Sequence, residues 1–245
     1  MISISKRELF IQAFELFKGN AQFFINIGIL LFVVQHMLPI MIGILFVPYS
    51  ASYFIFHIGY LFITTTISLW AIAQMLKILR SQPTDSFQTL FIYFPKVLRA
   101  IGGSFVITFS LLMIGVILFS ILGSQINLDW EIATLEMIGH AILNSTLLSV
   151  ITLVYFIIAT YLWIKTYFFI YYIIDQDLSL IESIKKSLHS TKGYEGDLFI
   201  VWVSTILMNF LGITFYGIGL MLTLPYTLII LSMFYAKYLC KIKEQ

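Results

Sequence analysis

The chain of 245 residues is 60% hydrophobic and only 11% charged, and its formal net charge is +2. Soluble domains carry roughly 25% charged residues, so much of this surface must meet something other than water. The small net charge, without a basic run, excludes nucleic acid as an expected partner. A single cysteine, Cys240, excludes an internal disulfide and a cysteine-based zinc site, and we expect no cofactor.

Long apolar stretches predict membrane-spanning helices, because a span needs about 20 apolar residues to cross about 30 Å of hydrocarbon. Four stretches contain no charged residue except Lys165: 21–47, 53–76, 100–123 and 141–174. A fifth, 198–236, is too long for one helix and holds a turn signal at 212–219, so we divide it into two spans. A hairpin confined to one leaflet is the alternative for these two. The predicted fold class is all-α, a polytopic transmembrane bundle of about six spans with amphipathic interface helices.

The basic residues predict the orientation, since Lys and Arg collect on the cytoplasmic side of membrane proteins. All 14 of them fall in segments that six spans place on one side: 1–20, 77–99, 165–197 and the tail after 236. The longest loop of the opposite side, 124–140, carries Asp129, Glu131 and Glu136 instead. Both termini are therefore expected in the cytoplasm. The sites predicted outside are Ser50, Asn127 and Gly217, and those predicted inside are Gln82, Ser190 and Gln245. A secretory signal peptide is not expected, because no small-residue cleavage site follows the first apolar run.

Three amphipathic segments precede the odd-numbered spans. The middle one spaces its large apolar residues along one helical face: Phe87, Leu90, Phe91, Phe94 and Leu98. The other two begin with capping boxes, Ser5 with Glu8 and Ser179 with Glu182. Each segment ends in a basic residue and glycine: Lys18-Gly19, Arg99 with Gly102-Gly103, and Lys192-Gly193. The single membrane domain, 1–245, then reads as three units of a surface helix and two spans: 1–80, 81–175 and 176–245. The alternative is that connectors beside lipid become amphipathic without any repeat.

The layout is similar to a known family. The stretches SFQTLFIYFPKVLRAIGG and YYIIDQDLSLIESIKKSLHSTKG, with a last helix pair ending in SMFYAKYLCKIKEQ, resemble the YciC-like inner-membrane proteins of bacteria. These are related to the membrane domain fused to some glycerophosphodiester phosphodiesterases. Their pattern of an acidic residue, a short helix with serine and a base, and a glycine is met by Asp177, Ser183, Lys186, Ser187 and Gly193. The resemblance implies the bacterial inner membrane and carries over no catalytic residue.

A search for catalytic motifs finds no phosphate-binding loop, dinucleotide fingerprint, HExxH pair or nucleophile elbow, so an enzyme is not expected. The acidic pair Asp175 and Asp177 has the spacing of a metal motif, but we favour helix capping at the end of a span. Glu136 and His140 share a helical spacing, and a solvated loop end is the favoured interpretation there as well.

Polar residues within spans are the candidate functional residues, because their burial without a partner costs free energy. They are Gln35, His36, His57, Asn144 and Asn209, together with Lys165. Pro39 and Pro225 are expected to kink their helices and free backbone carbonyls, which suits a transport path or helix packing, and we favour packing. Lys165 is expected at headgroup depth, within an aromatic belt of Tyr161, Trp163, Tyr167, Tyr171 and Tyr172.

These observations predict a non-enzymatic, multi-pass inner-membrane protein that serves envelope maintenance or membrane assembly through contact with membrane lipids. The alternative is a small-molecule or lipid transporter or channel built from repeated helix pairs. Protein partners and oligomeric state do not follow from the sequence.

Overall fold

The computed structural model describes residues 5–46, 48, 50–125, 146–215 and 217–240, and every regular element within them is helical. The first half contains α1 (Lys6–Gly19), α2 (Ala21–Phe32), η1 (Val33–Met37), α3 (Leu38–Leu45), α4 (Ala51–Leu79), η2 (Phe87–Tyr93) and α5 (Phe94–Gln125). The second half contains α7 (Thr146–Thr166), α8 (Phe169–Gln176), α9 (Leu180–Ser190), α10 (Glu195–Thr214), α11 (Leu220–Phe234) and η3 (Tyr235–Leu239). The all-α prediction is confirmed.

Six helical segments are long and apolar enough to cross a membrane. They are Ala21–Leu45, Ala51–Leu79, Phe87–Leu118, Ser149–Gln176, Glu195–Thr214 and Leu220–Leu239. The division of the last apolar stretch is confirmed, because α10 ends before a turn in which Gly217 takes φ +77°. Only glycine adopts that left-handed conformation at little cost.

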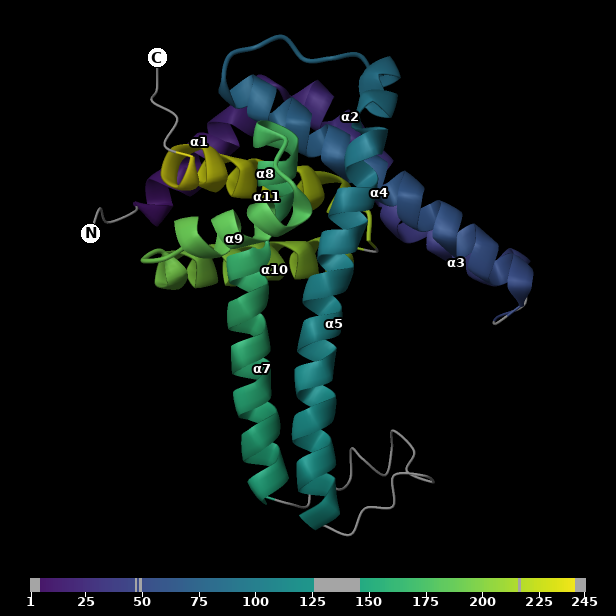
Figure 1. Ribbon diagram of the computed structural model, residues 1–245. Coiled ribbons are helices and arrows are strands. Elements are labelled where there is room, and N and C mark those ends of the chain that lie inside the picture. The colour runs from purple at the N-terminus through teal and green to yellow at the C-terminus, as the bar shows by residue number, and fades with distance from the viewer. Residues whose placement is uncertain (1–4, 47, 49, 126–145, 216, 241–245) are drawn as a thin grey trace.

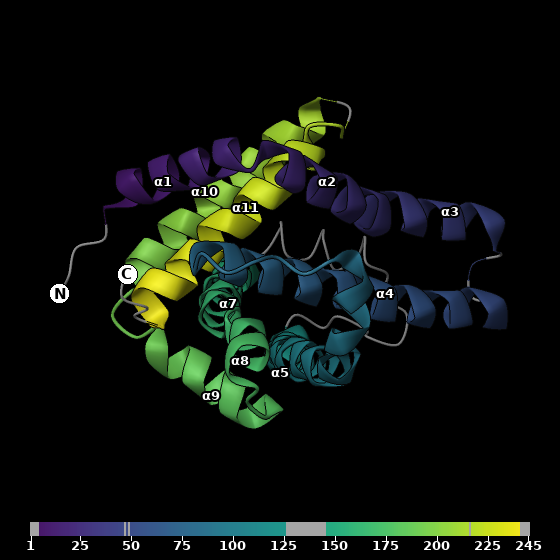
Figure 2. The same cartoon turned by 90° about the horizontal axis from the view of Figure 1, so that it is seen from above.

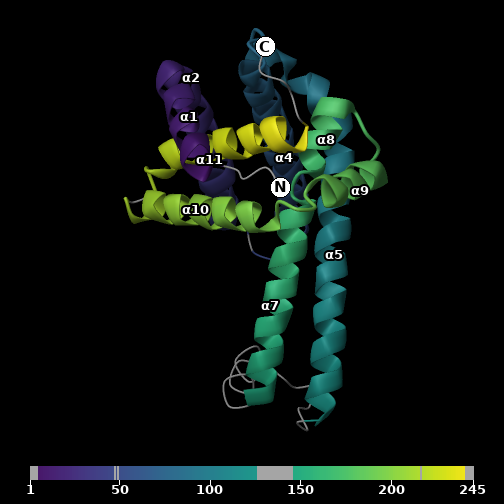
Figure 3. The ribbon, with the colours of Figure 1, turned by 90° about the vertical axis from the view of Figure 1, so that its left-hand side faces the viewer.

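The helices form three hairpins that share one base (Figure 1). Hairpin 1 consists of α2, η1, α3 and α4, hairpin 2 of α5 and α7, and hairpin 3 of α10 and α11. The shared base, here called the hub, contains α1, α8, α9, η3 and the adjoining ends of the hairpin helices. The views in Figures 2 and 3 show that the hairpins leave the hub in three different directions. The three hairpins follow the chain in the order of the predicted units, and the internal repeat stays a prediction.

The hub holds the hydrophobic core of the described residues. Its largest fully buried side chains are aromatic: Tyr171, Tyr172, Tyr235, Phe24, Phe168 and Phe234. They come from α2, from α8 with the residue before it, and from α11 with η3, so the core joins all three hairpins at one end. Each such side chain contributes about 1.5–3 kcal/mol by leaving contact with water or lipid headgroups.

The hairpins beyond the hub expose apolar side chains instead. Examples with half or more of their surface exposed are Ile44, Ile55, Phe105, Phe156 and Phe210, which are drawn from all three hairpins. Soluble monomers rarely expose apolar surface of this extent, so these faces are suited to lipid. Because transmembrane helices tilt on average by about 20° from the membrane normal, the diverging hairpins must draw closer to parallel when all of them span a flat bilayer.

Close packing between hairpins 1 and 3 depends on a glycine. A Cβ atom on Gly28 of α2 would collide with the carbonyl oxygen of Met221 in α11. This carbonyl lies four residues before Pro225, which has no N–H to bond it. The carbonyl freed by the proline therefore faces the Cα of the glycine, where helix–helix interfaces commonly form Cα–H···O contacts.

The predicted surface helices differ in outcome. α1 and α9 are separate helices followed by a break, and Ser179 with Glu182 forms the complete capping box. Ser5 accepts a hydrogen bond from the Glu8 amide, which is half of the predicted box. The middle segment is not separate, because η2 continues directly into α5. Gly102 and Gly103 lie inside α5, and a Cβ on Gly103 would collide with the Phe169 ring. These glycines make room for α8 and α9 instead of ending a helix.

The aromatic belt around Lys165 is partly wrong. Tyr161 and Trp163 are exposed near the end of α7, as a headgroup belt requires, but Tyr171 and Tyr172 are buried in the hub. The apolar stretch 141–174 predicts one uninterrupted helix here. It breaks after Thr166, and α8 starts again at Phe169, so the later tyrosines turn into the core.

Candidate functional site

A buried carboxylate lies where hairpins 1, 2 and 3 meet. The side chain of Asp175, at the end of α8, is 5% exposed and pairs with Arg80 of α4 at 2.5 Å. Its second oxygen accepts a hydrogen bond from the Tyr235 hydroxyl at 2.9 Å and a weak one from the Cys240 thiol at 3.7 Å. The prediction that Asp175 caps a helix is wrong. It is an ion-pair partner within α8, because the turn of the chain at Phe168 brings that face of α8 against α4 and η3.

Asp177 is the residue that ends α8, in the left-handed conformation with φ +51°. Arg99 of α5 bonds the Asp177 carboxylate at 2.7 Å and also donates to the Leu178 carbonyl at 3.0 Å. Lys96 donates to the Ile174 carbonyl at 3.0 Å. Two basic side chains of α5 therefore bond one carbonyl of the last turn of α8 and one just after it, where positive charge is favourable. The hydrogen bond from Arg99, and then the charge of Lys96, lower the pKa of Asp177.

Asp85, in the connection between hairpins 1 and 2, is likewise held by a basic side chain. Its carboxylate pairs with Lys77 at 2.6 Å, and its amide donates to the Gln74 side chain at 2.7 Å. The hydrogen bond from Lys77 lowers the pKa of Asp85. Gln74 itself is fully buried, so the loop that leaves α4 is fastened to the side of that helix.

Lys165 pairs with a residue of another span, but at the hub. Its ammonium lies 3.2 Å from the Glu195 carboxylate, in the first turn of α10, and 3.3 Å from the Tyr161 hydroxyl. Lys165 lies in the last turn of α7 and Glu195 begins α10, so the pair is at the hub end of both helices. The Lys165 side chain is only 12% exposed, so it is held in this contact and does not extend freely into solvent. The ion pair joins hairpins 2 and 3.

The intramembrane candidates are not brought together. Pro39 leaves the Gln35 carbonyl without its helical N–H donor, and the Tyr60 hydroxyl of α4 donates to that carbonyl at 3.4 Å. The Gln35 amide reaches Ser68 of α4 at 3.5 Å. π-helical η1 lies at the same place, directly before Pro39. Polar contacts between two helices of hairpin 1 therefore satisfy the polar groups near Pro39.

The remaining candidates have local partners. His57 bonds the Tyr53 carbonyl one turn earlier at 3.0 Å, and His36 contacts the Phe32 ring. Asn209 of α10 accepts a hydrogen bond from Thr227 of α11 at 3.4 Å. Asn144, Glu136 and His140 lie outside the residues that the structure describes. Contacts of this kind are typical of helix packing in membranes.

Sequence reasoning missed the buried face of α9. Ser183, Ser187 and Thr191, spaced four residues apart, are completely buried, and Ser187 donates to the Lys165 carbonyl at 2.7 Å. That carbonyl lies at the C-terminal end of α7, where no helical N–H follows to bond it. The spacing of these small hydroxyl residues is the signal in the sequence, and an analysis of apolar periodicity alone does not detect it.

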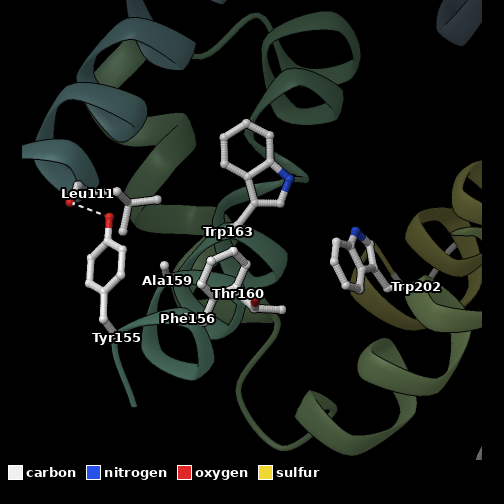
Figure 4. A pocket seen from close by; sticks show the side chains of 7 residues that line it. All are labelled: Leu111, Tyr155, Phe156, Ala159, Thr160, Trp163 and Trp202. Atoms are coloured by element: carbon white, nitrogen blue, oxygen red, sulfur yellow. Dashed lines mark hydrogen bonds between the residues drawn. The ribbon is translucent and has the colours of Figure 1, made fainter. Parts of the chain in front are cut away.

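One apolar groove of about 350 Å³ lies between hairpins 2 and 3 (Figure 4). It is lined by Leu111 of α5, by Tyr155, Phe156, Ala159, Thr160 and Trp163 of α7, and by Trp202 of α10. The Tyr155 hydroxyl donates to the Leu111 carbonyl at 2.9 Å, which closes one side. The two indole rings stand on opposite sides of the opening. None of the seven lining residues, all from the described part of the chain, carries a charge.

The fold and these sites define a helical membrane protein with a polar, ion-paired hub and apolar hairpins. Within the described ranges, no three His, Cys, Asp or Glu side chains are grouped to hold a metal ion. Comparison of the chain with protein-family models, curated proteins and solved structures found no match. The resemblance to the YciC-like proteins therefore stays a proposal.

Proposed function

We propose that this chain is a non-enzymatic protein of the bacterial inner membrane, akin to the YciC-like proteins, with both termini in the cytoplasm. It serves envelope maintenance or membrane assembly through contact with lipid. The observation that carries the proposal is the separation of chemistry along the molecule. Charged side chains are engaged with one another at the hub, while the hairpins present apolar faces and an apolar groove.

The orientation follows from the same separation. The described Lys and Arg residues all belong to elements at the hub, and basic residues favour the cytoplasmic side. Single cysteines in a Cys240→Ser background test this with an impermeant thiol reagent. Positions Ser50 and Gly217, at the hairpin tips, should be labelled from outside. Gln82 and Ser190 should be labelled only after the cytoplasmic side is opened, and labelling of these from outside would overturn the proposed topology.

The lipid role is tested by purification and reconstitution. Mass spectrometry of the protein purified in mild detergent should find phospholipid retained in about equimolar amount. Reconstituted vesicles should pass ions and small solutes no faster than vesicles without protein. Saturable solute flux through the reconstituted protein would instead establish the alternative, a transporter or channel.

A further inference from the structure

The apolar groove between hairpins 2 and 3 has the position and size of a binding site. It lies within membrane spans, and the side chains that flank it on α7 are exposed and apolar, including Leu153 and Ile157. Hydrocarbon is therefore the medium that reaches it. Its volume of about 350 Å³ falls in the range of small-molecule sites, at about 300–1,000 Å³.

The lining selects the chemistry of an occupant. From Tyr155 to Trp163 the groove follows α7 for about 12 Å, at 1.5 Å per residue. Its walls are aromatic and aliphatic, with Thr160 contributing the hydroxyl of a small side chain. An elongated apolar chain matches this lining, whereas an ion or a polar solute would lose its hydration without replacement.

The hub end of the groove has the composition of headgroup depth. Trp163 lines the groove there and is exposed, Tyr161 is exposed on another face of α7 at the same depth, and aromatic residues of this kind collect at the membrane interface. One turn further, Lys165 and Glu195 form a pair that presents both signs of charge with no net charge. A zwitterionic phospholipid headgroup, with an anionic phosphate and a cationic amine, is complementary to both charges of such a pair, and its chain would extend from there toward Tyr155.

We infer that the groove holds one acyl chain of a membrane phospholipid, with its headgroup beside the Lys165–Glu195 pair. This inference rests on the proposed lipid-contacting function and names its binding site. Lipid retained at another surface would leave the proposed function standing while this assignment failed.

Tryptophan quenching tests the assignment on the full-length chain. The Trp130→Phe variant keeps Trp163 and Trp202 at the groove, while Trp70 is buried in the hub and serves as an internal reference. Phospholipid with brominated chains is titrated into the protein in detergent micelles. The control chain carries Trp163→Phe, Trp202→Phe and Phe105→Trp, which moves the probe to an exposed face of α5 outside the groove.

The groove tryptophans should be half-quenched at a lipid-to-detergent ratio about tenfold lower than the control, which corresponds to about 1.4 kcal/mol. Ala159→Phe, which fills the groove, should remove this difference. Val154→Phe, on an exposed position of the same helix, should preserve it. Thr160→Leu provides a second filling variant if Ala159→Phe does not fold.

Equal half-quenching ratios for groove and control would mean ordinary lipid contact only and would overturn the assignment. Insensitivity to both filling variants would do the same. Quenching at low ratio by a brominated free fatty acid, but not by the brominated phospholipid, would also reject it.

Discussion

The hub and the hairpins differ in how their polar side chains find partners. Charged side chains form ion pairs in the hub, whereas neutral polar side chains form hydrogen bonds in the hairpins. In the hub, the buried Asp175 is paired with Arg80, and Lys165 is paired with Glu195. In the hairpins, polar groups are bonded to the neighbouring helix, as Tyr60 is to the Gln35 carbonyl, or within their own helix, as His57 is to the Tyr53 carbonyl. The comparison teaches that hairpins meet at the hub through ion pairs together with apolar packing and close glycine contacts, whereas single hydrogen bonds join the two helices of one hairpin. Five experiments can break or sharpen this comparison.

The largest expected effect is a change in the distance between the hairpin tips. Spin labels at the hairpin tips, on Ser50→Cys and Gly217→Cys, should come closer together in a bilayer nanodisc than in a micelle, because a flat bilayer aligns its spans. Labels at the hub, on Gln82→Cys and Ser190→Cys, should keep their separation. Double electron–electron resonance measures the distance between the two labels of each pair in a Cys240→Ser background. A change at the hub equal to that at the tips would show that the hub is not a rigid base.

The largest expected loss of stability follows from breaking the hub. Arg80→Ala leaves the Asp175 carboxylate, 5% exposed, without its cation and should lower the free energy of unfolding by about 3 kcal/mol. Thermal unfolding in detergent measures the loss. Arg7→Ala removes an exposed arginine that has no ion pair among the described residues, and should change stability by less than about 0.5 kcal/mol. Equal effects of the two variants would contradict the role of the hub pair.

The next largest loss of stability is expected from disturbing the contact between hairpins 1 and 3. Gly28→Ala forces a Cβ against the Met221 carbonyl and should cost about 1–3 kcal/mol. Gly43→Ala, in the same hairpin, meets no atom within 4 Å and should be neutral or slightly stabilising. Unfolding measured side by side distinguishes the close contact from any general effect of glycine replacement.

Within hairpin 1, the effect should be smaller. Tyr60→Phe removes the donor to the Gln35 carbonyl and should cost about 0.6 kcal/mol, a typical value for hydrogen bonds between transmembrane helices. Pro39→Ala restores a backbone N–H to that carbonyl, so Tyr60→Phe should cost less in the Pro39→Ala background. A double-mutant cycle on unfolding free energies measures the coupling. Additive effects would mean that the proline and the tyrosine do not serve the same carbonyl.

The smallest expected effect is a pH dependence at Asp85. Its pKa is lowered in the folded chain by Lys77, so the stabilisation is fully present above the unfolded pKa, about 4. It is lost as the pH falls through the lowered folded pKa. Because the pair is partly exposed, we expect about 0.5 kcal/mol. Asp85→Asn should flatten the stability profile below about pH 4, the unfolded pKa, and Lys77→Gln should do the same.

For much of the candidate site, the sequence did not predict which residues contact each other. Gln35 and Pro39 were recognised as a kink with polar neighbours, because a proline removes a donor wherever it lies in a helix. The Gln35 carbonyl is bonded by Tyr60, which lies on another helix. Which side of a helix faces its neighbour depends on how both helices are rotated about their axes, and the local sequence does not show this. Asp175 was assigned to capping for the same reason, since Arg80 is distant in the chain.

The sequence by itself determined the helices, their number and their apolar surfaces, because hydropathy, span length and turn residues act locally. It also determined that the basic residues gather at one end. Only the tertiary structure decided that η2 runs on into α5, that α9 buries its serines, and that the late tyrosines enter the core. Those outcomes depend on which faces meet at the hub, where Gly28 and Gly103 set the closest approach of helices distant in the chain.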